Sequence, residues 1–225
     1  VRGSRDDPKP IWGFAQMMRF ISLLLSLAIA GSAFGAETGH PKSEFGDSKA
    51  GQQIANQVCA VCHGLDGNSP IPANANLAGQ HAEYLYKQLT EFKSGARANA
   101  IMAGMVANLS DHDMRNLASY YAGQAAKETS AKNMELAATG QQLYRGGVPD
   151  KGIAACSACH SPDGTGIPPV YPRVSGQHSE YTTAQLRAFR SGARNNDVNS
   201  MMRMVASRLS DDEIKALAEY IAGLR

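Results

Sequence analysis

The chain has 225 residues, a formal net charge of +2 at neutral pH and four cysteines. From residue 36 onward, basic and acidic residues are balanced at 18 each, which disfavours a nucleic-acid-binding protein, because such proteins cluster positive charge. About 190 residues lie in that part of the chain, which is enough for two small domains.

The first 35 residues are typical of a leader. Residues 1–16 are polar and contain Gly and Pro without apolar periodicity, and Met17 and Met18 follow them. Residues 20–30 form an eleven-residue apolar run, which has the length of a signal-peptide core and is short for a membrane span. We predict translation from Met17 or Met18, cleavage after Gly35 or a neighbouring small residue, and export to the periplasm. An uncleaved membrane anchor is the alternative.

Two copies of the pentapeptide C-x-x-C-H use every cysteine. Two thiols three positions apart on a helical turn can each form a thioether with one vinyl group of the same porphyrin, and the following histidine then lies under the iron. A redox dithiol, a structural disulfide or half a zinc site are alternatives, but the adjoining histidine, present twice, favours two covalent c-type haems. The predicted haem-attachment and axial residues are Cys59, Cys62 and His63 in the first copy, and Cys156, Cys159 and His160 in the second.

The chain is an internal duplication with an offset of 97 residues. The segment Gly79–His81 recurs as Gly176–His178, and Ser94–Arg97 recurs as Ser191–Arg194. Two tandem domains of the same fold are the simplest explanation. The expected organisation is upstream residues and signal peptide 1–35, first domain 36–126, polar linker 127–135 and second domain 136–225.

Both halves predict the same order of helices. A helix begins near Gly51 or Gly140 and runs to the haem-attachment turn, and a Gly/Pro-rich loop follows. Another helix begins near His81 or its counterpart, and the last begins at Ser110 or Ser210, where the second copy has a capping-box pattern. Strand signals are nearly absent. The predicted fold class is therefore all-α, with each of the two small domains wrapped around one haem.

Met102 and Met202 are the expected second axial ligands. Each lies eight residues before the capping serine, in a segment expected to be a loop, and no other pair of methionines aligns in this region. His81 and His178 also align, so bis-histidine ligation is the alternative. Thioether ligation raises the reduction potential and fills the sixth position, which suits electron transfer and argues against a dihaem peroxidase.

Pro72 and Pro169 are expected to orient the haem histidines. Each lies nine residues after its histidine, and its backbone carbonyl could accept the Nδ1 proton. The alternative is that both prolines only shape the loop.

The two halves differ in charge and in one segment. Residues 36–130 carry a net charge of −2 and residues 131–225 a net charge of +2, and the second half has an extra segment, 145–151, before its haem turn. We expect acidic partners to dock on the basic half. The arginines expected to contribute are Arg187, Arg190, Arg194, Arg203 and Arg208.

The ordered motifs resemble dihaem cytochrome c4. The resemblance rests on the two pentapeptides, the segments Leu77–Gln80 and Val174–Gln177, the Ser-Gly-Ala-Arg repeats and the methionine eight residues before Leu-Ser-Asp, and it covers roughly residues 46–225. It implies two class I cytochrome c domains related by approximate two-fold symmetry. The first half departs from the pattern, since it has Ala75-Asn76 where the second has Tyr171-Pro172.

The resemblance also implies a function. It indicates a periplasmic electron carrier, not an enzyme, which passes electrons one at a time from a quinol-oxidising complex to a terminal oxidase or reductase, with possible loose membrane association. No nucleic-acid partner is expected. The alternative is a dihaem electron-transfer subunit of a flavoprotein dehydrogenase such as sulfide dehydrogenase.

Overall fold

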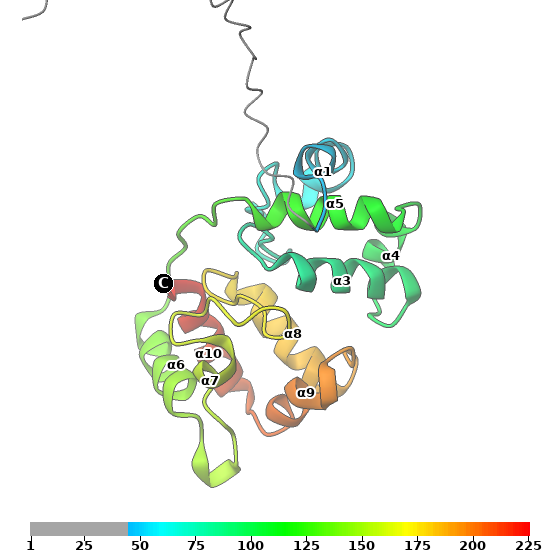
Figure 1. Ribbon diagram of the computed structural model, residues 1–225. Coiled ribbons are helices and arrows are strands. Elements are labelled where there is room, and N and C mark those ends of the chain that lie inside the picture. Colours follow the sequence, from blue (N-terminus) through cyan, green and yellow to red (C-terminus); the bar gives the residue numbers. More distant parts are fainter. Residues whose placement is uncertain (1–44) are drawn as a thin grey trace, which may run out of the picture. The chain divides into compact units, whose positions relative to one another are not determined.

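The computed structural model describes residues 45–225 (Figure 1). The predictions about the translation start, the apolar run and the signal cleavage site lie outside the described residues. Within residues 45–225 the regular structure is helical, and β pairing is confined to isolated bridges such as Val148 with Ile153 and Ile167 with Tyr171. The predicted all-α fold is confirmed.

From residue 45 onward, the first half contains five α-helices and one π-helical turn, which joins the first two helices. The haem-attachment turn is thus reached along one nearly continuous helical path, as predicted. The elements are α1 (Ser48–Ile54), the π-helical turn η1 (Ala55–Cys59), α2 (Ala60–His63), α3 (Ala82–Ser94), α4 (Ala100–Val106) and α5 (Asp111–Ala122).

The second half repeats this order with additions. Its first helix begins earlier than expected, because Asn133 caps it by accepting a hydrogen bond from the Leu136 amide, so Met134 and Glu135 are helical rather than part of the linker. The elements are α6 (Met134–Gly146), the 3-10 turn η2 (Pro149–Lys151), α7 (Ser157–His160), α8 (Ser179–Ser191), the 3-10 turn η3 (Val198–Ser200), α9 (Met201–Ala206) and α10 (Asp211–Gly223).

The closing helix of each half begins with a capping box. Ser210 accepts a hydrogen bond from the Glu213 amide while the Glu213 carboxylate accepts one from the Ser210 amide. The first half has the same reciprocal pair with Ser110 and Asp113. These contacts satisfy amide groups that a helix start leaves without partners, and they fix where α5 and α10 begin.

The opening and closing helices of each half cross at a glycine. An ideal Cβ placed on Gly51 of α1 would lie 2.0 Å from the Asn116 carbonyl oxygen on α5, and one on Gly140 of α6 would lie 2.0 Å from the Ala216 carbonyl oxygen on α10. No larger residue fits at this distance. The crossing brings the α5 and α10 core positions inward. The predicted set is buried, namely Met114, Leu117, Ala118 and Tyr121 in α5, and Ile214, Leu217, Ala218 and Ile221 in α10.

Side-chain hydrogen bonds join the two halves through α3 and α8. Arg97, just after α3, donates to the Tyr181 hydroxyl at 3.0 Å and to Gln185 Oε1 at 2.9 Å, both on α8. Arg194, just after α8, donates in return to the Tyr84 hydroxyl on α3 at 2.9 Å. Each arginine is only 8% exposed. Tyr84 and Arg97 of the first half therefore form a reciprocal contact with their counterparts Tyr181 and Arg194 of the second.

None of the helices within residues 45–225 has the length and apolar character that a membrane span requires.

Candidate functional site

The four cysteines lie at the two helical turns that the pentapeptide predicts. Cys59 ends the π-helical turn and Cys62 lies in α2, whereas Cys156 precedes α7 and Cys159 lies within it. All four are free thiols. Burial raises the pKa of Cys59, and it raises the pKa of Cys156 to about 11, so these two thiols are protonated at neutral pH in the protein chain alone.

Each haem histidine is held by a backbone carbonyl. His63 Nδ1 donates to the Ala75 carbonyl oxygen at 2.8 Å, and His160 Nδ1 donates to the Pro172 carbonyl oxygen at 2.9 Å. Because Nδ1 is protonated and bonded, Nε2 carries the lone pair and is the ring nitrogen available to a metal ion. Burial lowers the pKa of both histidines, which favours this neutral form.

The predicted roles of Pro72 and Pro169 are wrong. Pro72 lies inside a turn that the Asn74 amide closes on the Ile71 carbonyl at 2.9 Å, and Pro169 lies between Ile167 and Tyr171, whose amides and carbonyls bond to each other. The chain therefore reverses at each proline. The carbonyl that accepts the histidine proton belongs to the residue three positions after each proline.

This register also corrects the comparison of the two loops. Ala75 and Pro172 each lie twelve residues after their histidine and make the same hydrogen bond. Ala75-Asn76 thus matches Pro172-Arg173, and Asn74 matches Tyr171. A backbone carbonyl can be supplied by any residue type, so the sequence alone gave no side-chain signal for these two positions.

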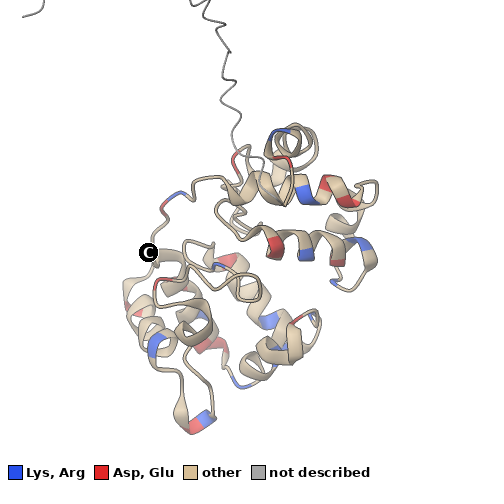
Figure 2. Ribbon diagram, in the orientation of Figure 1, with Lys and Arg blue, Asp and Glu red and all other residues tan. Residues whose placement is uncertain are grey.

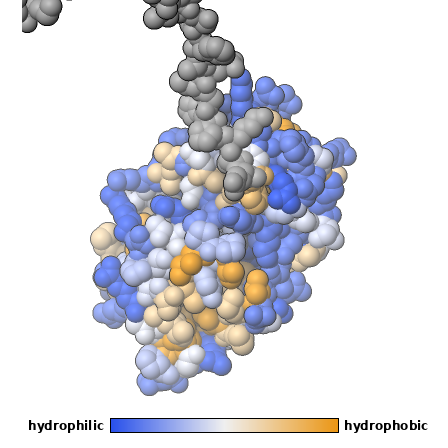
Figure 3. Space-filling view, in the orientation of Figure 1, coloured by the Kyte–Doolittle hydropathy of each residue, from blue (hydrophilic) through white to orange (hydrophobic). Residues whose placement is uncertain are grey.

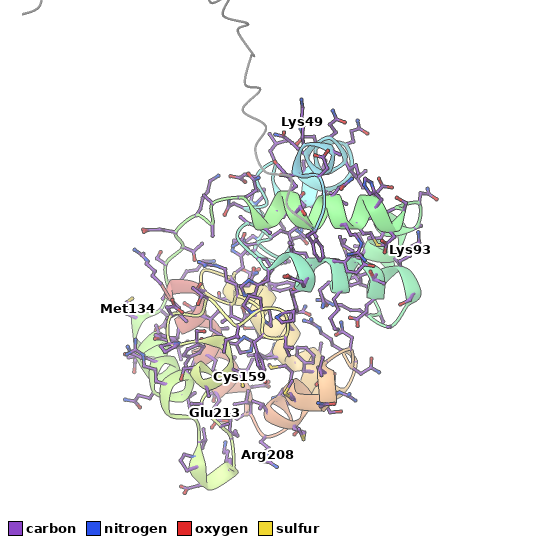
Figure 4. The ribbon with its side chains drawn as sticks, viewed as in Figure 1. Lys49, Lys93, Met134, Cys159, Arg208 and Glu213 are labelled. Carbon is purple, nitrogen blue, oxygen red and sulfur yellow. The ribbon has the colours of Figure 1, made fainter. Side chains whose placement is uncertain are left out.

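The two predicted methionine ligands occupy equivalent places. Met102 lies on α4 and Met202 on α9, so both are helical rather than in loops. Met102 packs against the same buried cluster as Cys59, and Met202 against the same cluster as Cys156. Each half therefore brings a thioether to the apolar core that also contacts its haem-attachment turn. Figure 4 shows the place of Cys159 in the second half.

The aligned histidines that formed the alternative ligand pair lie at helix starts, and one of them contacts the opposite half. His178 precedes α8, and its Nε2 bonds to the Ser69 carbonyl oxygen of the first half at 2.9 Å. His81 precedes α3, and its Nε2 is buried with no hydrogen-bond partner in the described part of the chain. The His178 contact gives this residue a role in joining the halves.

The donor set fits two covalently attached haems. Each half supplies two free thiols, an imidazole fixed through Nδ1 and a half-buried thioether, which are the groups that c-type haem attachment and axial ligation require. Large apolar side chains are also exposed near the haem loops, as a porphyrin face requires. They include Ile71 in the first half and Ile167 and Val170 in the second. Figure 3 shows apolar side chains gathered over the second half on the face in view.

The expected basic docking surface is only partly present. Arg194 is buried between the halves, so its inclusion was wrong. Arg187 and Arg190 both pair with Asp211, at 3.3 and 2.6 Å, and Arg203 pairs with Asp197 at 2.7 Å. Figure 2 shows acidic and basic residues interspersed along the ribbon of the second half. The net charge of +2 is unchanged by these pairs, but three of the five arginines lie beside a carboxylate and so do not form an uninterrupted basic surface.

Comparison with known proteins identifies the family. The Cytochrome c family model matches residues 48–124 and 137–225. The chain is 48% identical over 183 residues to cytochrome c4 from Thiocapsa roseopersicina, an alignment that covers 80% of this chain and 94% of that protein. The crystal structure of reduced recombinant cytochrome c4 from Pseudomonas stutzeri superposes with a TM-score of 0.77 at 43% identity, covering 80% of this chain and all of that one.

The chain belongs to the cytochrome c4 family. Two tandem cytochrome c domains, two haem c groups and electron transfer rather than catalysis are thereby shown. Cys59 and Cys62 form one haem-attachment site, and Cys156 and Cys159 form the other. Another relative, a thiosulfate dehydrogenase electron acceptor from Stutzerimonas stutzeri, is 39% identical over 180 residues, covering 79% of this chain and 83% of that protein.

Proposed function

We propose that this cytochrome c4 is a periplasmic carrier that takes electrons one at a time from a quinol-oxidising complex and delivers them to a terminal oxidase or reductase. The observation that carries the proposal is the equivalent placement of a thioether in both halves, on the short helices α4 and α9 against the core that each haem turn contacts. A haem with both axial positions filled exchanges electrons and leaves no site for oxygen or peroxide.

The proposed axial pairs are His63 with Met102 and His160 with Met202. His63 and His160 are fixed in the same tautomer by equivalent carbonyls, so both irons would receive the same nitrogen. The engagement of His178 Nε2 by the Ser69 carbonyl supports methionine over histidine as the sixth ligand. The domain assignment that goes with this proposal ends the linker before Met134, where α6 begins.

Substitution of the methionines tests the ligand pairs. Met102→Ala and Met202→Ala should each remove the sulfur-to-iron absorption band at the red end of the ferric spectrum for one haem, and the potential of that haem should fall. Met105→Ala and Met204→Ala are matched controls, because these side chains are 47% and 55% exposed. A double variant of Met102 and Met202 that keeps both bands would contradict the assignment and favour His81 and His178.

A sulfur-compound dehydrogenase is the second candidate donor. The similarity to the thiosulfate dehydrogenase electron acceptor favours it over the flavoprotein subunit that the sequence suggested as an alternative. Two assays separate these functions. Reduction of the purified holoprotein by quinol with membranes supports the quinol-linked function, and rapid reduction by a thiosulfate dehydrogenase supports the second. Gel filtration of native extract tests the flavoprotein subunit, which would co-elute with a flavin-containing chain.

A further inference from the structure

Two glutamines clamp the backbone of the opposite half. Gln80 of the first half donates through Nε2 to the Arg173 carbonyl oxygen at 2.8 Å and accepts from the Arg173 amide at 2.9 Å. Gln177 of the second half does the same with Asn76, at 3.0 and 2.9 Å. The two pairs are related by the 97-residue offset. Each glutamine side chain thus pairs with one residue of the other half as a neighbouring strand would.

The clamped amides belong to the peptide groups that hold the haem histidines. The Ala75 carbonyl, which accepts from His63, and the Asn76 amide, which donates to Gln177, are the two ends of one peptide group. The Pro172 carbonyl, which accepts from His160, shares its peptide group with the Arg173 amide, which donates to Gln80. In each case a histidine, one peptide group and a glutamine of the opposite half form a continuous chain of hydrogen bonds.

We propose that Gln80 and Gln177 are positioning residues that tune the haem of the opposite half. A peptide group whose amide hydrogen is bonded becomes more polarised, so its carbonyl is a stronger acceptor. A stronger acceptor draws the Nδ1 proton and makes the histidine a more electron-rich ligand, which stabilises ferric iron. Gln80 therefore lowers the potential of the haem on His160, and Gln177 lowers that of the haem on His63.

The surroundings of the clamps support this role. Gln80 is 7% exposed, so water does not compete effectively for its hydrogen bonds. Each glutamine Oε1 also accepts from the amide of the next residue, His81 at 3.0 Å or His178 at 3.1 Å, which fixes the orientation of the side-chain amide. The proposal rests on the axial role of His63 and His160 proposed above.

The test is a crossed pattern of reduction potentials. Gln80→Met keeps the side-chain length and removes both hydrogen bonds to Arg173, together with the one from the His81 amide, and Gln177→Met removes the equivalent three in the other half. Gln80→Met should raise the potential of the second haem alone, and Gln177→Met that of the first haem alone. We expect a change of about threefold in the redox equilibrium constant, which is roughly 28 mV for one electron. Each haem is followed through its own hyperfine-shifted methyl signals during an NMR redox titration of the holoprotein.

Asn196→Ala is the matched control. Asn196 donates across the halves to Gln88 Oε1 at 2.9 Å and to Glu91, but it bonds to neither histidine-bearing peptide group. It should leave both potentials unchanged while weakening the contact between the halves. In the reduced protein, hydrogen exchange of the Arg173 amide should become faster in Gln80→Met and stay slow in the control.

Gln80→Glu is the second variant, in case Gln80→Met fails to fold. The carboxylate keeps an acceptor for the Arg173 amide, so that amide should stay protected and the second potential should not rise. Unchanged potentials in the Met variants, or equal shifts in both haems, would overturn the proposal. A wild-type spectrum without histidine and methionine ligation would instead contradict the axial assignment, so the two failures are distinguishable.

Discussion

The two halves of the molecule are alike in their interior and differ in the surface segment that leads to the haem-attachment turn. Both cross their opening and closing helices at a glycine, both start the closing helix with a capping box, and both bind the haem histidine to a backbone carbonyl twelve residues away. These shared contacts are the ones that position the cysteines, histidines and methionines. Duplication has therefore retained the haem-binding framework in each half.

The difference lies in how the chain reaches the haem turn. In the first half, α1, η1 and α2 run from Ser48 to His63 without a break. In the second, eight additional residues separate Gly140 from Cys156, and they form the bridge between Val148 and Ile153 around η2. Lys151 in η2 then pairs with Glu213 on α10 at 2.7 Å. The two haem-attachment turns are therefore flanked by different surfaces.

Removal of the attachment thiols is the strongest test that each half binds its own haem in the same way. Replacing Cys59 and Cys62 together by alanine should leave one covalent haem per chain, and replacing Cys156 and Cys159 should do the same, because each pair serves only its own half. Haem staining after denaturing electrophoresis and the intact mass would report the loss. Two covalent haems in either double variant would contradict the attachment sites.

The helix crossings should be equally sensitive in both halves. Gly51→Ala and Gly140→Ala each force a methyl group against a backbone carbonyl, and we expect a loss of about 3 kcal/mol in the free energy of unfolding. Gly104→Ala on α4 and Gly146→Ala on α6 are controls, since an ideal Cβ at either site meets no atom within 4 Å. These should be neutral or stabilising by up to about 1 kcal/mol.

Denaturant titration of the holoproteins, followed by circular dichroism, measures these differences. If Gly51→Ala were tolerated as well as Gly104→Ala, the close approach of α1 and α5 would be wrong for the first half. A large effect in one half only would show that the framework has diverged.

The residues that the sequence predicted correctly are those with a side-chain signature. The pentapeptides located the cysteines, the apolar spacing located the core positions of α5 and α10, and Ser210 with Glu213 marked a helix start. The capping box at Ser110 was missed, because an aspartate rather than Glu or Gln lies three residues later.

The contacts that escaped prediction depend on the backbone or on the meeting of the two halves. Ala75 and Pro172 act through carbonyl groups, so the choice of Pro72 and Pro169 rested on residue type alone. Gln80 was visible only as part of a repeat, since its partner lies 93 residues away. Arg194 was counted as surface charge, whereas the structure buries it.

Reversing the charge of one exposed residue in each half tests whether the second half directs the docking of partners. Arg208 is exposed, and its guanidinium donates to the Lys151 and Gly152 carbonyls rather than to a carboxylate, so it keeps a positive charge at the rim of the second half. We expect Arg208→Glu to slow electron transfer to an acidic partner about threefold at low salt, with the difference shrinking as salt rises.

Lys49→Glu provides the same charge change on the first half. Lys49 lies on α1, and Figure 4 shows it apart from Arg208. Stopped-flow rates with the native donor and acceptor at several ionic strengths would compare the two variants. Equal salt dependence for both would show that the basic half does not direct docking.

The smallest expected effect concerns one ion pair beside the first haem turn. Lys127 lies 2.9 Å from Asp66, and its hydrogen bond lowers the pKa of Asp66 from 3.8 to about 2. The equivalent Asp163 bonds to Thr165 instead.

Because the folded-state pKa of Asp66 is depressed, its stabilising effect is complete above about pH 4 and is lost as the pH falls from 3.8 to about 2. Since Lys127 is exposed and Asp66 is only half-buried, we expect Asp66→Asn to lower the free energy of unfolding by only about 0.5 kcal/mol at neutral pH. Denaturation at pH 7 and near pH 2 would show the difference shrinking with acid. A difference that is equally large at both pH values would mean that Asp66 acts through its loop hydrogen bond to Asn68 rather than through its charge.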